Sequence, residues 1–156
     1  MNNISVLRCT GINFFRYLKN LGISRETKLI VLSSKNNYSY DEKDIKNVRI
    51  IINRKRLNLI KHLDMFLNSL VRILPPNTTF IGYFSDKKTV NRYGFRFKTI
   101  MKSVNKINIF SSSGTDYIID KSEVLELLEK NGFKTIDMKV MNGLTYFISQ
   151  NVNCQA

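Results

Sequence analysis

The stretch from Leu57 to Asp86 constrains the fold most, because a helix pattern, a helix stop and a strand pattern follow one another within it. Apolar side chains recur there every three or four residues, which places them on one stripe of an α-helix facing a core. These positions are Leu59, Leu63, Phe66, Leu70 and Leu74. Pro75 and Pro76 end the helix, because proline lacks the N–H of the helical ladder and disfavours helical geometry in the preceding residue.

The residues after the two prolines predict a buried strand. Thr78 to Phe84 is β-branched and aromatic with little polarity, as expected of a strand that is covered on both faces. A helix, a tight turn and a buried strand form the second half of a βαβ crossover. This stretch therefore predicts an α/β sandwich.

The residues before Leu57 predict further strands and one helix. Gly11 to Leu21 has apolar residues at helical spacing, and Gly22 follows where a left-handed residue ends many helices. Lys35 to Lys46 is polar and unpatterned, which predicts a loop. The predicted strands are Ile4–Arg8, Lys28–Ser33 and Val48–Asn53.

The last third of the chain predicts a closing hairpin. Asp120 and Glu123 have capping-box spacing at the start of a helix that ends at Asn131-Gly132. Asn142-Gly143 predicts a type I′ turn, because both central residues of that turn need positive φ. The flanking strands are Phe133–Val140, with Ile136, Met138 and Val140 on one face, and Leu144–Ser149; a helix over Phe95–Asn105 and a strand over Ile107–Phe110 are predicted before them. The expected fold is α/β, with a mostly parallel Rossmann-like sheet flanked by helices and closed by this antiparallel hairpin.

Length and composition predict one domain over residues 1–156 in a reduced, cytoplasmic setting. No run reaches the roughly 18 apolar residues of a membrane span, and the first residues lack the pattern of a signal peptide. Cys9 and Cys154 have neither disulfide nor metal-ligand spacing, and the single histidine adds no zinc pattern. We expect no bound metal.

The chain is strongly basic, with a net charge of +13 that is unevenly distributed. Residues 1–106 carry 21 basic and 6 acidic side chains, whereas residues 107–156 carry 4 and 6. Between Lys87 and Thr115 there is no acidic residue. This segment predicts weak, non-specific polyanion binding, with an ordinary solvated lysine-rich surface as the alternative. Its basic residues are Lys87, Lys88, Arg92, Arg96, Lys98, Lys102 and Lys106.

Three stretches resemble the class I S-adenosylmethionine-dependent methyltransferases. HLDMFLNSLVRILPPNTTFIGYF is similar to the family's helix, "LkPgG" turn and fifth strand, SEVLELLEKNGFKTIDM to its "s.ee...lle.aGF..v" segment, and NGLTYFISQN to its last strand. The resemblance implies that Val48–Asn53 is the fourth strand, Lys28–Ser33 the third and Ile4–Arg8 a remnant of the second. In the family's strand order, 3-2-1-4-5-7-6, the first strand would then be missing.

The resemblance does not extend to the family's cofactor signature. Class I enzymes hold the methionine end of the cofactor with a glycine-rich loop after the first strand, where the backbone approaches the ligand closely. An acidic residue at the end of the second strand usually holds the ribose. The seven glycines of this chain form no such cluster, and no acid lies around Arg8 and Cys9. We therefore expect no cofactor for this chain alone.

Candidate site residues lie where the strands end, because open α/β sheets bind ligands at the carboxyl ends of their strands. The resemblance implies cofactor contacts for Asn53 and Arg54, and substrate contacts for Arg56, Ser85 and Asp86. Strand termination is the alternative for Asn53 and Ser85. His62 could act as a base, although a lone helical histidine is more often a surface or core residue. The cluster of Phe14, Phe15 and Tyr17 is interpreted as core and rim rather than as a platform for stacked bases.

These observations leave three functions open. The first is a truncated or degenerate methyltransferase-like protein, inactive alone, that acts as an interaction or regulatory subunit with a protein partner. The second is an active methyltransferase that binds S-adenosylmethionine in an atypical pocket. The third is a basic nucleic-acid-binding module.

Overall fold

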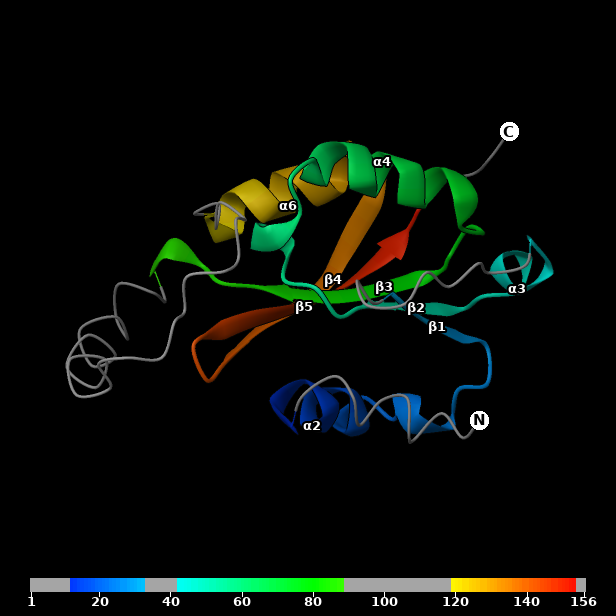
Figure 1. Cartoon of the computed structure of the whole chain (residues 1–156), viewed down its shortest axis with the longest axis horizontal. Coiled ribbons are helices and arrows are strands. Elements are labelled where there is room, and N and C mark those ends of the chain that lie inside the picture. Colours follow the sequence, from blue (N-terminus) through cyan, green and yellow to red (C-terminus); the bar gives the residue numbers. More distant parts are fainter. Residues whose placement is uncertain (1–11, 33–41, 89–118, 154–156) are drawn as a thin grey trace, which may run out of the picture.

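The computed structural model describes residues 12–32, 42–88 and 119–153, which form a five-stranded sheet with helices on both faces (Figure 1). The strand order is β1-β2-β3-β5-β4. β1, β2 and β3 run parallel, whereas β5 runs antiparallel to both β3 and β4. The strands are β1 (Leu29–Leu32), β2 (Ile50–Asn53), β3 (Thr79–Phe84), β4 (Phe133–Met141) and β5 (Leu144–Asn151). The predicted α/β class and the closing hairpin are confirmed.

Helices α4 (Leu63–Ile73) and α6 (Lys121–Lys130) cover one face of the sheet, and α2 (Ile12–Asn20) covers the other (Figure 1). The helix predicted from Leu57 is interrupted: a 3-10 turn, η2 (Leu57–Leu59), precedes α4, and another, η1 (Ile23–Arg25), follows α2. Part of the predicted loop over 35–46 is a helix, α3 (Glu42–Lys46). Five residues are too few to show a helical period, so the sequence pattern missed it. No helix among the described residues is long and apolar enough to cross a membrane.

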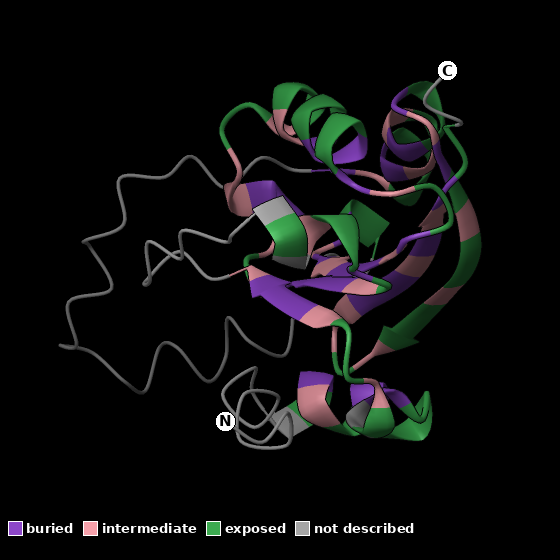
Figure 2. Ribbon diagram, turned by 90° about the vertical axis from the view of Figure 1, so that its right-hand side faces the viewer, coloured by how far each residue is buried: buried purple, intermediate pink, exposed green. Residues whose placement is uncertain are grey.

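Each face of the sheet has its own core. Phe80 and Phe84 of β3 pack with Phe133 and Phe147 under α4 and α6. Ile81, the residue after Phe80 in β3, packs against α2 on the opposite face. This alternation makes β3 a member of both cores, and Figure 2 shows buried strands between exposed outer helix surfaces.

The local signals in the sequence act as predicted. Leu74, before the two prolines, has extended geometry (φ −86°, ψ 140°) and ends α4. The Asp120 carboxylate accepts from the Ser122 N–H at 3.3 Å, and the Glu123 carboxylate accepts from the Asp120 N–H at 2.7 Å, which completes the capping box. The hairpin turn has two left-handed residues, Asn142 (φ 51°) and Gly143 (φ 79°). The start of α6 and the β4–β5 turn were therefore predictable from single short motifs.

A bulge in β4 changes the predicted face of one side chain. Thr135 pairs with Ser149 and Asp137 with Ile148, so Ile136 is an extra residue without a cross-strand partner. Ile136 is 59% exposed. Met138 packs against the core under α4 and α6, as predicted, but Ile136 does not.

The position of β1 corrects one assignment made from the resemblance. β1 pairs directly with β2, with Val31 opposite Ile52. In the family's order the neighbour of the fourth strand is the first strand, and the third lies two strands further away. The assignment of Lys28–Ser33 to the third strand is therefore wrong by position. The elements predicted at Ile4–Arg8, Phe95–Asn105 and Ile107–Phe110 lie outside the described residues.

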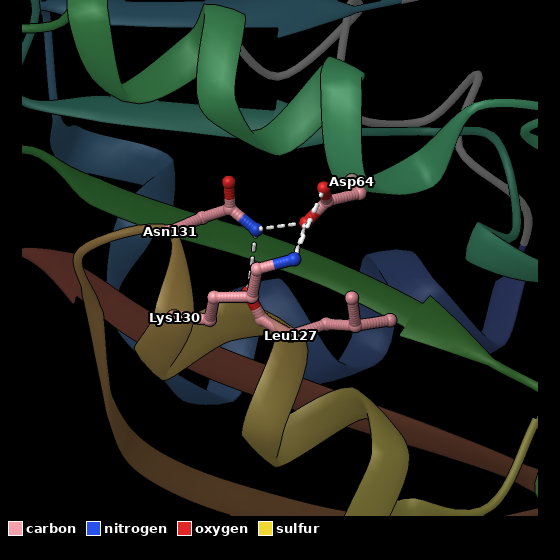
Figure 3. A network of polar contacts seen from close by, with 4 residues as sticks. All are labelled: Asp64, Leu127, Lys130 and Asn131. Atoms are coloured by element: carbon pink, nitrogen blue, oxygen red, sulfur yellow. Dashed lines mark hydrogen bonds and ion pairs between the residues drawn. The ribbon is translucent and has the colours of Figure 1, made fainter.

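A polar network connects the two helices on the same face of the sheet (Figure 3). The Asp64 carboxylate of α4 accepts from the Lys130 ammonium at 3.2 Å and from the Asn131 amide at 2.9 Å. The Asn131 amide also donates to the Leu127 carbonyl at 2.8 Å. Because Asn131 is buried and Asp64 exposed, the network ties the end of α6 to the start of α4 at the edge of the core.

We expect Gly82→Ala to destabilise the fold by about 1–3 kcal/mol, because overpacking forces neighbours out of their preferred geometry. A Cβ at this β3 position would lie 2.7 Å from the ring of Phe147, the cross-strand partner. Urea unfolding measures the loss. In the double variant Gly82→Ala/Phe147→Leu the two effects should be less than additive, and strict additivity would contradict this contact.

We expect Asp64→Asn to remove part of the acid sensitivity of the fold. The hydrogen bond from Asn131, and then that from Lys130, hold the pKa of Asp64 below its ordinary value of 3.8. A lowered folded-state pKa contributes stability above that value, and the contribution is lost as pH falls through the folded pKa. The stability gap between wild type and Asp64→Asn in urea unfolding should therefore shrink from about pH 5 to pH 2. Glu126→Gln, on the exposed side of α6, is the control, and a gap that does not depend on pH would contradict the prediction.

Candidate functional site

The carboxyl ends of β1, β2 and β3 meet at one edge of the sheet, which is where open α/β sheets bind ligands. In the register of the strands, Leu32 is level with Asn53, and Ile52 is level with Ile81. The residues that follow these strands are therefore neighbours in space. They are Asn53, Arg54, Lys55 and Arg56 after β2, and Ser85, Asp86, Lys87 and Lys88 after β3.

Asn53 closes a turn with its own chain. Its amide donates to the Lys55 carbonyl at 2.7 Å, and its side-chain oxygen accepts from the Lys55 N–H at 3.2 Å. The side chain is 3% exposed. Such Asx-type bonds are a common way to end a strand, so both polar atoms of this predicted cofactor contact are engaged within the protein.

Asn58 and Ser85 join the end of β2 to the end of β3. The Asn58 side-chain oxygen accepts from the Ser85 N–H at 2.7 Å, and its amide donates to the Ser85 carbonyl at 3.0 Å. Arg56 donates to the Ser85 hydroxyl at 3.1 Å. Two of the predicted substrate-side residues, Arg56 and Ser85, are thus in contact. Sequence reasoning missed Asn58, because a polar residue in a predicted helix turn reads as exposed, whereas it is buried in η2.

Tyr83 links this edge to the aromatic side chains on the α2 face. Its hydroxyl donates to the Arg54 carbonyl at 2.8 Å, and the Arg54 N–H donates to the Leu32 carbonyl at 3.1 Å. Burial raises the pKa of Tyr83, although the charges of Arg56 and Arg54 oppose the shift. Tyr83 is therefore a neutral hydrogen-bond donor that fixes the backbone after β2.

Asp86 is the acidic residue among those that follow β2 and β3, and it is 5% exposed. Its carboxylate accepts from the Lys88 N–H at 3.2 Å. The backbone here also pairs with Ile119, because the Lys87 N–H donates to the Ile119 carbonyl at 3.1 Å. Asp86 is therefore a buried residue that caps the helical residues Lys87 and Lys88 after β3.

Only some of the other predicted functional residues lie within the described part of the chain. Lys87 and Lys88 are exposed at this edge. His62 is the exposed residue directly before α4. Asp64, two residues later, accepts a hydrogen bond from Asn131 at the end of α6. Among the described residues, no three His, Cys, Asp or Glu side chains are grouped to hold a metal. Arg92, Arg96, Lys98, Lys102 and Lys106 lie outside the described residues.

Of the predicted aromatic cluster, Phe14 and Tyr17 lie in the core and Phe15 is partly buried against it. Phe14 and Tyr17 of α2 are each 3% exposed and pack against Tyr146, with ring centroids 5.6 and 5.1 Å away. Burial, and then the charge of Asp137, raise the pKa of Tyr17 to about 12. The Tyr17 hydroxyl has no hydrogen-bond partner among the described residues. These rings are enclosed by the sheet and α2, so they offer no open surface for stacking bases.

A separate hollow of about 480 Å³ lies at the opposite edge of the sheet, before β2 and β3. α3, the end of α4 and the two prolines enclose it. Its walls are largely apolar, with Lys46 and Arg72 among the lining residues. It is remote from the carboxyl ends of the strands and shares no residue with the candidate site.

Solved structures show that this fold is that of the class I methyltransferases. One similar structure is the complex between the Haloferax volcanii Trm112 methyltransferase activator and a methyltransferase: TM-score 0.54, 10% identity, 80% of this chain and 61% of that chain covered. Another is a SAM-dependent methyltransferase from Thermotoga maritima: TM-score 0.51, 11% identity, 96% of this chain and 87% of that chain covered. The chain thus spans about three-fifths of the length of the first of these. No protein-family model and no curated protein sequence matches it.

We expect Asn58→Ala to destabilise the protein by about 2–4 kcal/mol, because two hydrogen bonds are lost and the Ser85 N–H and carbonyl are left without their partner. Asn68→Ala, on the exposed side of α4, is the matched control and should change stability by less than about 0.5 kcal/mol. Urea unfolding gives both values. Similar values for the two variants would mean that Asn58 does not join the strand ends.

Proposed function

We propose that this chain is a degenerate methyltransferase-like protein that does not methylate on its own and acts as an interaction or regulatory subunit of a protein partner. The observation that carries the proposal is the state of the carboxyl edge. Asn53, Asn58 and Ser85, its polar side chains, are hydrogen-bonded to the protein itself. Side chains that already form hydrogen bonds within the protein connect the strand ends. They do not form a preformed binding site for a cofactor.

The segment after β1 supports the same proposal. We infer from the position of β1 beside β2 that β1 is the counterpart of the family's first strand, so what the chain lacks is the cofactor loop and not the strand. The loop that binds the methionine end of the cofactor would follow directly. Residues 33–41 read SSKNNYSYD and contain no glycine. A chain with a Cβ at every position of this segment approaches a ligand less closely than a glycine loop does.

Charge at the edge also opposes the cofactor. S-adenosylmethionine carries its transferable methyl group on a sulfonium cation. Arg54, Lys55 and Arg56 follow β2, and the nearby carboxylate, Asp86, is buried against its own turn. Positive side chains beside a sulfonium repel it in proportion to their proximity. The described residues therefore do not fit the cofactor.

Pairing with a second protein occurs in one similar structure, the Haloferax volcanii complex of a methyltransferase activator and a methyltransferase. In our proposal, this chain contributes a methyltransferase-like surface to a partner, and the partner supplies the catalytic site. The alternative is an active methyltransferase with an atypical pocket, to which residues 33–41 or 89–118 would contribute.

Calorimetric titration with S-adenosylhomocysteine decides between the two. We expect no measurable heat of binding, because each absent charge-assisted hydrogen bond forgoes roughly 1.5–3 kcal/mol, or about one to two decades of affinity. The purified protein must show a cooperative urea transition in the same buffer, so that a null result reports a folded chain. Micromolar binding would contradict the proposal and favour the active enzyme.

A further inference from the structure

Two basic runs that are far apart in the sequence meet at the carboxyl edge of the sheet. Arg54-Lys55-Arg56 follows β2, and Lys87-Lys88 follows β3. Parallel pairing of β2 with β3 brings both runs to the same side, and Arg56 donates at 3.1 Å to the hydroxyl of Ser85, two residues before Lys87. We call these five residues the basic edge.

The backbone of the basic edge is held in place by hydrogen bonds. Asn53 fixes Lys55 from both sides, and Asn58 fixes Ser85. The Lys87 N–H donates to the Ile119 carbonyl at 3.1 Å. The backbone that carries these cations is therefore already ordered. Binding of a ligand then costs less conformational entropy than it would on a flexible loop.

The basic edge keeps a positive balance after its acidic neighbours are counted. Asp86 is buried and accepts from the Lys88 N–H. Asp120 lies near enough to Lys88 that this lysine contributes to its lowered pKa, after the hydrogen bond from Ser122. Among the residues that the structure describes, five cations thus lie near two carboxylates. Lys55, Lys87 and Lys88 are exposed to solvent, where they can meet a ligand.

We propose that the basic edge binds the phosphodiester backbone of a nucleic acid, without reading its bases. A backbone with one negative charge per nucleotide suits several separated cations better than a single small anion does, and its binding releases counterions. Arginine and lysine are both effective phosphate partners. The described helical residues at this edge are Lys87 and Lys88, and contacts of lysine with phosphates carry no sequence information.

This inference is independent of the proposed subunit role. It also changes the surface expected from the sequence, which ran from Lys87 to Lys106: the structure adds the three residues after β2. The two surfaces share Lys87 and Lys88, and the remaining basic residues, between 92 and 106, lie outside the described part of the chain. Variants at the end of β2 therefore separate the basic edge from that segment.

The test compares two triple variants that each remove three positive charges. Lys55→Ala/Lys87→Ala/Lys88→Ala removes the exposed lysines of the basic edge. Lys19→Ala/Lys134→Ala/Lys139→Ala removes exposed lysines from α2 and β4. Binding of a labelled single-stranded RNA of about 20 nucleotides is followed by fluorescence anisotropy between about 50 and 200 mM salt. Lys55→Ala alone reports on the β2 side of the edge.

We expect the edge variant to lower the log–log salt slope by about 2, since each phosphate contact on a single strand contributes about 0.7. Between about 50 and 200 mM salt, the fold-loss of RNA affinity should then be about twenty times smaller in the edge variant than in wild type. Lys55→Ala should lower the slope by about 0.7, and the control variant should keep the wild-type slope.

Four results would overturn the proposal. The first is no binding of the RNA by wild type at about 50 mM salt, and the second is an equal loss of RNA affinity in both triple variants. The third is an unchanged salt slope in Lys55→Ala. The fourth is that polyglutamate competes as well as unlabelled RNA of the same total charge. The second would reduce the effect to net charge, and the fourth would indicate an acidic protein as the partner.

Discussion

The two halves of the sheet meet where Gly82 leaves room for the ring of Phe147. β3 is the last of the parallel strands, and β5 is the first of the antiparallel pair. The ring lies so close to Gly82 that a Cβ would meet it at 2.7 Å. Phe147 in turn packs edge-on against Phe80, with centroids 5.3 Å apart. The core under α4 and α6 therefore depends on one residue of β3 having no side chain.

Elements with a local cause were predictable from the sequence, whereas their order in the sheet was not. Two prolines, a capping box and Asn142-Gly143 each act through a few neighbouring residues, and each has the predicted geometry. The neighbour of β2 is decided by long-range pairing, so the resemblance placed Lys28–Ser33 in the wrong position. The β4 bulge likewise has no signature in FKTIDM, and it moved Ile136 to solvent.

The sequence predicts at which edge of the sheet the candidate site lies, but not which side chains are in contact there. Parallel strands bring their ends together, so Arg56 and Ser85 could be expected near each other, and they are in contact. The role of Asn58 depends on a break between η2 and α4 that the apolar spacing concealed. The basic character of residues 54–56 is plain in the sequence, but only the pairing of β2 with β3 joins it to Lys87.

The internal position of β5 also bears on how the protein is made. β5 lies between β3 and β4, and its Ser149 hydroxyl donates to the Phe80 carbonyl across 69 residues of chain. While the ribosome is still synthesising residues 144–151, β3 has one side unpaired and Phe80 lacks Phe147, one of its aromatic partners. The parallel half of the sheet therefore has an unpaired strand edge and an uncovered apolar face until β5 has been synthesised.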